Sequence, residues 1–215
     1  SLLTKTVRDA ENRIITQSYD AEDKLIAVSS PTGGTTSYAY TPFGEISTLG
    51  DANGNVTMLH YDERGLQTSV ESADTGRRSS VWNAFGELVS QTDALSPANT
   101  INFSYDQLGR LIQRSDSGQS PTIWTFHTAS GPLLGLPQRV TAPLGSAPAG
   151  FVEQYGYDAL GRRTSLSTTI DGTTYVTGYG WDSLGRVATM SYPQTVDGAQ
   201  VSLAYHYDST GNLDV

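Results

Sequence analysis

The sequence has no cysteine, no long hydrophobic run and no excess of positive charge, and each absence excludes a class of protein. Without cysteine there can be no disulfide framework, no thiolate metal site and no cysteine nucleophile. The 13 Lys and Arg residues are outnumbered by 22 Asp and Glu residues. The net charge of −9 would repel a phosphate backbone, so we expect no nucleic-acid partner. No window approaches the roughly 18 apolar residues that a membrane-spanning helix needs.

Blocks rich in Ala, Leu, Glu and Lys, which favour helices, are also missing. Aromatic residues make up only 9% of the chain, yet 12 of the 20 are tyrosine, and glycine is plentiful at 22 residues. Strands favour aromatic residues and tight turns favour glycine. The composition therefore predicts an all-β chain. Separately, the N-terminal residues contain no apolar stretch long enough for a signal peptide.

An aromatic residue followed by aspartate and then glycine recurs along the whole chain. Aspartate at the next position can bond backbone amides two residues on, and glycine four positions after the aromatic can take a positive φ. The aromatic anchors are Tyr19, Tyr40, Tyr61, Trp82, Tyr105, Phe126, Tyr157, Trp181 and Tyr207, at spacings of 21, 21, 21, 23, 21, 31, 24 and 26. Clear turn pairs are Asp62 and Gly65, Asp106 and Gly109, Asp158 and Gly161, and Asp182 and Gly185.

The segments around each turn alternate as strands do. A second large apolar residue often lies two positions before the anchor, as Tyr38 does before Tyr40, which places both on one strand face. A further turn signal follows about ten residues later, for example Asp116-Ser117-Gly118. The pattern predicts a continuous antiparallel meander of about 18 strands. Open sheets rarely exceed about 10 strands without curling, so we expect this one to curve, coil or stack.

One interval departs from the period, between Phe126 and Tyr157. His127 and Ser130 replace the aspartate and the glycine, and Pro- and Gly-rich stretches follow. We interpret residues 127–150 as an irregular repeat with an enlarged loop, and a domain boundary is the alternative. The sequence then predicts a single repeat array over residues 1–215.

The segments YDALGRRTSL, YDQLGRLIQR and WDSLGRVATM strongly resemble the YD repeats of the Rhs family, and the resemblance covers essentially the whole chain. This family includes bacterial polymorphic toxins, components of insecticidal toxin complexes and the animal teneurins. The resemblance implies a β-sheet ribbon that spirals into a hollow shell. It also implies partners, namely the remainder of the parent shell and an enclosed toxin domain, and secretion or delivery by a bacterial secretion system.

The same resemblance limits what can be carried over. Family members usually end their shell with a core segment containing aspartates linked to self-cleavage, and nothing here matches that segment. We therefore expect an internal part of a longer chain, with no catalytic residue, no cofactor and no metal. Its terminal strands should expose unpaired edges that favour self-association.

Three other features could suggest a site, and each has a simpler interpretation. His60 and His206 each precede an anchor, on the opposite strand face, and His127 is distant in sequence, so a metal site is not expected. Residues 51–62 resemble a calcium loop, but its sixth position is Val56 rather than glycine. Residues 72–76 resemble the start of an Asp-box, but Ser79 stands where an aromatic residue is expected. A hairpin turn explains both segments.

The repeated aspartates and aromatics also have structural interpretations. Acid–base catalysis needs two converging carboxylates, not one on each hairpin. Aromatic ladders stabilise sheets by themselves. Two alternatives to the shell remain open: a cell-surface module that binds glycans or a partner cell through exposed aromatics, and, more distantly, a propeller glycosidase.

Overall fold

The computed structural model describes residues 2–95, 98–144 and 147–214. These residues contain strands and turns and no helix, so there is also no helix that could cross a membrane. Strands β1 to β18 form a sheet in which each strand pairs antiparallel with the next, and β19 and β20 form a separate pair. The predicted all-β meander of hairpins is confirmed.

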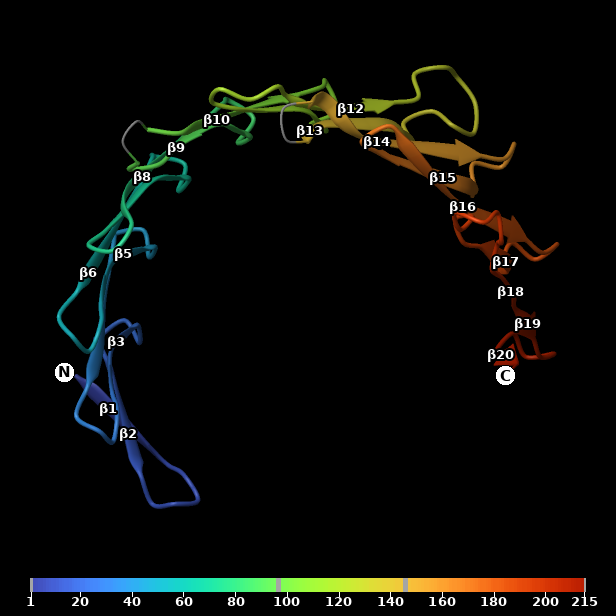
Figure 1. Cartoon of the computed structure of the whole chain (residues 1–215). Helices are drawn as coiled ribbons and strands as arrows, with labels where there is room; N and C mark the ends of the chain where they lie inside the picture. Colours follow the sequence, from blue (N-terminus) through green and yellow to red (C-terminus); the bar gives the residue numbers. More distant parts are fainter. Residues whose placement is uncertain (1, 96–97, 145–146, 215) are drawn as a thin grey trace. The chain divides into compact units, whose positions relative to one another are not determined.

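The chain divides into two compact units, residues 1–102 and 103–215, and the boundary in the sequence falls within strand β10. The first unit is blue to green in Figure 1. Its strands are β1 (Leu3–Arg8), β2 (Ile14–Tyr19), β3 (Leu25–Ser29), β4 (Thr35–Tyr40), β5 (Ile46–Gly50), β6 (Val56–Tyr61), β7 (Gln67–Ser72), β8 (Gly76–Trp82), β9 (Leu88–Thr92) and the first half of β10 (Thr100–Tyr105).

The second unit is green to red in Figure 1 and has longer strands in its middle. After the second half of β10 come β11 (Leu111–Asp116), β12 (Thr122–Phe126), β13 (Pro137–Leu144), β14 (Ala147–Tyr157), β15 (Arg163–Ile170), β16 (Thr173–Trp181), β17 (Val187–Ser191), β18 (Ser202–Ala204), β19 (His206–Tyr207) and β20 (Leu213–Asp214). Each unit is a run of hairpins, and the proposal of a single array over 1–215 stays a prediction.

The irregular interval contains strands as well as a loop. Strand β13 and the start of β14 lie within the residues predicted as an enlarged loop. The irregular turn itself covers residues 127–136, where the His127 N–H donates to the Leu136 carbonyl at 2.9 Å. In a regular turn the equivalent bond joins residues four apart, as from Asp62 to Leu66, so this turn is five residues longer.

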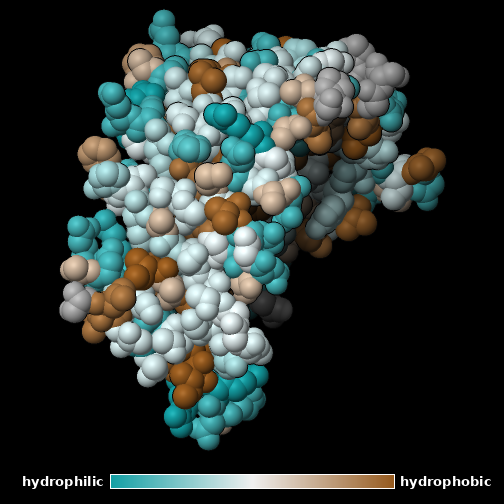
Figure 2. All heavy atoms as spheres, turned by 90° about the vertical axis from the view of Figure 1, so that its left-hand side faces the viewer, coloured by the Kyte–Doolittle hydropathy of each residue, from teal (hydrophilic) through white to brown (hydrophobic). Residues whose placement is uncertain are grey.

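The sheet is one layer thick and has no hydrophobic core. Among the described residues no hydrophobic side chain is fully buried, and Ser69 is the one polar residue that is, at 2% exposure. On the face shown in Figure 2, hydrophobic side chains form small separate groups among polar ones. Sheets usually gain independent stability by packing a face on another layer. Here cross-strand contacts and the turns must hold the hairpins together.

The two faces of the sheet nevertheless differ. In β4, Tyr38 and Tyr40 are half-buried while Thr35, Ser37 and Ala39 on the other face are exposed. Strand β6 repeats the pattern, with Leu59 and Tyr61 half-buried and His60 exposed. Large aromatic and aliphatic side chains thus cover one another on one face, and the other, more exposed face mixes polar residues such as Ser37 and His60 with apolar ones such as Val56 and Met58.

Candidate functional site

The repeated feature of the molecule is a five-residue turn that begins directly after every anchor except Phe126. In the turn 62–66, the Asp62 N–H donates to the Leu66 carbonyl at 2.9 Å, and the Gly65 N–H donates to the Asp62 carbonyl at 3.0 Å. Gly65 has a φ of 77°. A turn followed by a residue in the left-handed region produces a bulge, and the strand register shifts between His60 and Tyr61.

The other predicted turn glycines lie in the same conformation. Their φ values are 74° for Gly109, 78° for Gly161 and 80° for Gly185. The first turn has Asp23 in place of glycine, and it too has a positive φ of 62°. Aspartate tolerates this region better than most residues. The assignment of all these residues to a purely structural role stays a proposal.

The turn aspartate is an acceptor for the loop backbone. In the turn 182–186, Asp182 Oδ1 accepts from the N–H groups of Leu184 and Arg186, each at 2.9 Å. Its Oδ2 accepts from Arg186 Nε at 2.7 Å. Asp106 and Asp158 have the same three kinds of bond. Asn83 and Thr41 replace aspartate in two turns and still accept from the two backbone groups.

These bonds lower the pKa of the turn carboxyls. For Asp106 the main cause is the hydrogen bond from Arg110, and for Asp158 and Asp182 it is the backbone N–H of the arginine four residues on. A carboxyl whose pKa is lowered by folding stabilises the fold at any pH above its unfolded-state pKa, which is about 3.9 for aspartate. That contribution is lost as the pH falls through the folded-state pKa. These carboxylates are ionised acceptors at neutral pH, which does not suit a general acid.

Arginines in three of the turns link their repeat to the next aromatic anchor. Arg110 lies 4.0 Å from the ring centre of Phe126, and Arg186 lies 4.1 Å from that of Tyr207. Arg162 approaches Trp181 at 5.6 Å. Each arginine therefore holds its own aspartate and stacks on the anchor of the following hairpin, a contact worth about 0.5–1 kcal/mol at exposed sites.

Most of the anchors also bond backward to the preceding hairpin. In these anchors the polar ring atom donates to the carbonyl of the first residue of an earlier strand, at 2.7–2.9 Å, whereas the Tyr19 hydroxyl donates to Gln17 Oε1 in its own strand. The pairs are Tyr40 with Leu25, Tyr61 with Ile46, Trp82 with Gln67, Tyr157 with Pro137, Trp181 with Arg163 and Tyr207 with Val187. We call this series the anchor ladder.

The anchor ladder replaces backbone hydrogen bonds that neighbouring hairpins lack at the ends of the strands beside the anchors. Strands β5 and β6 pair from Gly50 to Thr48, and the register does not reach Ile46. The Tyr61 hydroxyl satisfies the Ile46 carbonyl instead, at 2.9 Å. A buried or half-buried carbonyl without a partner is costly, so tyrosine and tryptophan, which carry a donor, suit this position. Phe126 carries none, and the close arginine stack covers its ring.

Replacing Tyr61 with phenylalanine tests the anchor ladder directly. The ring remains while its bond to the Ile46 carbonyl is lost, and we expect a loss of about 1 kcal/mol in the free energy of unfolding. Urea unfolding followed by circular dichroism measures it. Tyr175→Phe is the matched control, because the Tyr175 side chain is 44% exposed and its hydroxyl makes no hydrogen bond within the described residues. Equal effects of the two changes would contradict the proposed bonding.

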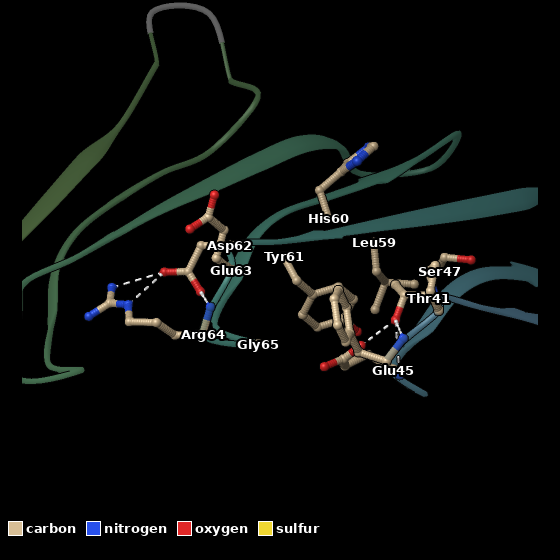
Figure 3. A pocket seen from close by; sticks show the side chains of 12 residues that line it. Thr41, Glu45, Ser47, Leu59, His60, Tyr61, Asp62, Glu63, Arg64 and Gly65 are labelled. Carbon is tan, nitrogen blue, oxygen red and sulfur yellow. Dashed lines mark hydrogen bonds and ion pairs between the residues drawn. The ribbon is translucent and has the colours of Figure 1, made fainter.

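Open grooves lie between neighbouring turns, and several of their polar groups are engaged within the turns themselves. One has a volume of about 580 Å³ and lies between the turns 41–45 and 62–65. Figure 3 shows the Thr41 hydroxyl bonded to the Glu45 carboxylate and Arg64 bonded to Asp62. His60 points away from Tyr61 in the same view. No two free carboxylates converge there, as acid–base catalysis would require.

The remaining candidates are not brought together. Both Asp51 oxygens bind within their own turn, to Asn53 and Asn55. The His127 ring meets the Tyr157 ring edge-on at 5.8 Å, and its Nε2 is buried without a hydrogen bond in the described structure. No group of three His, Asp or Glu residues among the described residues could hold a metal ion.

Sequence reasoning missed the anchor ladder and the arginine stacks. Both were signalled by the arginine that follows the turn glycine in three copies, Arg110, Arg162 and Arg186, and by the preference for tyrosine over phenylalanine at the anchors. Both contacts join residues of different repeats.

Residues 19–56 match the RHS Repeat family model. The fold is similar to that of a TcdB2-TccC3-TEV crystal structure, with a TM-score of 0.66 and 19% identity over 98% of this chain and 12% of that chain. A TcdB2-TccC3 structure without its hypervariable C-terminal region gives a TM-score of 0.64, with the same identity and coverage. The Tc holotoxin pore of Photorhabdus luminescens gives 0.52, with 17% identity over 97% of this chain and 13% of that chain. No curated protein matches the sequence.

Proposed function

We propose that this chain, whose residues 19–56 match the RHS Repeat model, is a wall segment of a hollow β-shell that encloses and carries a toxin domain. The observation that carries the proposal is a continuous one-layer sheet, without a hydrophobic core, whose hairpins are tied to one another by the anchor ladder. Such a sheet suits a wall better than a globular domain. The similarity in fold to toxin-complex chains supports the proposal. This chain spans 12% of the first of them, as a segment of a larger wall would.

The wall in this proposal has no catalytic activity. Its repeated carboxylates serve the turns, and its repeated aromatics serve the anchor ladder. Its partners are the remainder of the shell and the enclosed toxin domain, and its setting is a secreted or delivered toxin. No cofactor or metal takes part.

Protease protection in the parent protein tests enclosure. The parent protein that contains these repeats and its toxin domain is digested with a broad protease beside the isolated toxin domain. We expect the toxin domain to survive in the parent protein and to be degraded alone. Digestion of the toxin domain at the same rate in both samples, while the repeats persist, would show that the repeats do not enclose it.

The glycan-binding alternative is less well supported. The indole N–H of Trp82 donates to the Gln67 carbonyl and that of Trp181 to the Arg163 carbonyl, so both rings are committed to the anchor ladder. Both are half-buried. A glycan array probed with the chain and with Trp181→Ala separates the two functions, because only a binding module loses a signal.

A further inference from the structure

One groove of the second unit has an aromatic lining and a single charged residue. It is open, has a volume of about 450 Å³ and lies on the aromatic face of the sheet. Its lining includes three aromatic residues, two aliphatic residues and one cation: Tyr157, Tyr179, Trp181, Leu136, Val187 and Arg163. We call it the Arg163 groove.

Arg163 stands where the repeat otherwise has an aliphatic residue. It is the sixth residue after its anchor and the first of β15. In the other regular copies this position is Leu25, Ile46, Gln67, Leu88, Leu111, Val187 and Leu213. The anchor ladder uses the backbone carbonyl of this position, which accepts from Trp181 Nε1 at 2.8 Å. The ladder therefore does not require an arginine here.

The Arg163 guanidinium has no carboxylate partner within the described residues. It lies 4.9 Å from the ring centre of Tyr155, and the residue is exposed. The carboxylates of its own hairpin are engaged elsewhere, because Glu153 accepts from the Tyr155 hydroxyl at 2.6 Å and Asp158 pairs with Arg162. A guanidinium presents a planar fork of N–H donors that fits a carboxylate. The groove thus offers an unpaired positive charge beside aromatic rings, in a chain of net charge −9.

The irregular turn 127–136 contributes to the same groove. Its last residue, Leu136, lines the groove, and Leu136 Cδ1 lies 3.4 Å from the place of a Cβ on Gly161. The Pro132 carbonyl oxygen of this turn also lies against Gly161. Two departures from the repeat, the lengthened turn and Arg163, therefore meet at one place. Their convergence indicates a local role beyond the formation of turns and sheet.

The shape of the Arg163 groove favours an extended peptide. Its lining runs from Pro137 in β13 to Val187 in β17, across neighbouring strands of the sheet. Neighbouring strands lie about 4.8 Å apart, so the first and last of these backbones are separated by about 19 Å. An extended peptide covers that length with about six residues, at roughly 3.3 Å each. Apolar side chains of such a peptide would lie on the rings, and a carboxylate would reach Arg163.

The Arg163 groove does not suit a periodic partner. Its arginine and its lengthened anchor turn each occur once among the described hairpins, whereas another stretch of the same repeats presents features that recur with every hairpin. A second copy of this chain brings a further charge of −9, which opposes its approach. Within the proposed shell, the partner that remains is the enclosed toxin domain.

We propose that the Arg163 groove holds an extended segment of the enclosed toxin domain, in which a carboxylate side chain pairs with Arg163 and apolar neighbours lie on the aromatic rings. This contact rests on the proposed shell and adds the chemistry by which the wall holds its cargo. It also places the aromatic face of this part of the sheet on the inside.

Light-induced cross-linking in the parent protein tests the contact. p-Benzoylphenylalanine in place of Tyr179 puts the reactive group in the groove. The same replacement of Val176 is the matched control, because Val176 is exposed on the opposite face of the same strand. Mass spectrometry of the digested product identifies the captured segment. We expect the Tyr179 probe to capture, severalfold more than the Val176 probe, a toxin-domain segment that has an aspartate or glutamate among apolar residues.

Variants of Arg163 test the part played by its charge. Arg163→Leu restores the residue type of the other copies and should lower the capture severalfold, whereas Arg163→Lys should keep most of it. Both variants should keep the circular dichroism spectrum, because the side chain is exposed and the carbonyl still accepts from Trp181. In an Arg163→Glu protein, replacing the captured carboxylate residue with arginine should restore the capture.

The proposal is wrong if the Tyr179 probe captures another part of the repeats, a second copy of the chain, or nothing. Equal capture from the two faces, or capture that Arg163→Leu leaves unchanged, would also overturn it. All these outcomes leave the toxin domain of the unmodified parent protein protected from protease. Failure of the shell itself is recognised separately, as digestion of that domain.

Discussion

Gly161→Ala is expected to destabilise the second unit by about 3 kcal/mol or more, well beyond the effect of the same change at Gly185. Both glycines have a φ near 80°, where a residue with a Cβ pays roughly 1–2 kcal/mol. A Cβ at Gly161 would also lie 2.8 Å from the Pro132 carbonyl oxygen, whereas nothing lies within 4 Å of one at Gly185. Forcing an atom into such a contact costs typically about 1–3 kcal/mol.

The pair of variants separates backbone strain from the clash. Urea unfolding followed by circular dichroism gives the two losses, and hydrogen exchange shows where protection falls. We expect exchange to rise in the turn 127–136 only for Gly161→Ala, because that turn has to move away. Identical losses for the two variants would mean that the irregular turn does not rest on Gly161.

Asp182→Ala is expected to lower the urea midpoint of unfolding at least about twice as much as Asp182→Asn. Alanine leaves the N–H groups of Leu184 and Arg186 without their acceptor and releases the arginine from its ion pair. Hydrogen bonds to charged groups are stronger than those between neutral groups. Asparagine keeps the Oδ1 acceptor and loses mainly a partly exposed ion pair, which contributes little.

Asn83 is the natural precedent for the asparagine variant. Its Oδ1 accepts from the Phe85 and Glu87 N–H groups at 2.9 and 3.0 Å, and its Nδ2 donates to Glu87. Thermal and urea unfolding of the two Asp182 variants provide the comparison. A loss from asparagine as large as that from alanine would assign the stabilisation to the ion pair rather than to the backbone acceptors.

The hairpin fold could be predicted from the sequence because its information is local. The aromatic, Asp62 and Gly65 lie within five residues, and the chemistry of those residues is enough to define a turn and a bulge. The period then follows from repetition. The interval after Phe126 shows where local prediction fails. The spacing to the next anchor is longer there, but the sequence does not indicate that five extra residues lie in the turn or that β13 and β14 pair beyond it.

Contacts between repeats could not be predicted in the same way. The bond from Tyr61 to the Ile46 carbonyl depends on strands β5 and β6 ceasing to pair before Ile46, and no local signal marks that point. The stack of Arg186 on Tyr207 joins residues 21 positions apart. Such contacts depend on how one hairpin lies on the next, which is a property of the folded sheet.

The anchor ladder makes the array behave as a one-dimensional chain with nearest-neighbour coupling. The anchors of the ladder bond the hairpin before them, as Trp181 bonds Arg163 and Tyr207 bonds Val187. The contact that a hairpin makes with the hairpin before it is therefore of the same kind as the contact that it makes with the hairpin after it. A gene encoding such a chain can gain or lose whole hairpins and keep every remaining joint, whereas a single-residue insertion within a strand would reverse the faces of the residues that follow. Repeat number is thus a free variable through which evolution can set the width of the sheet.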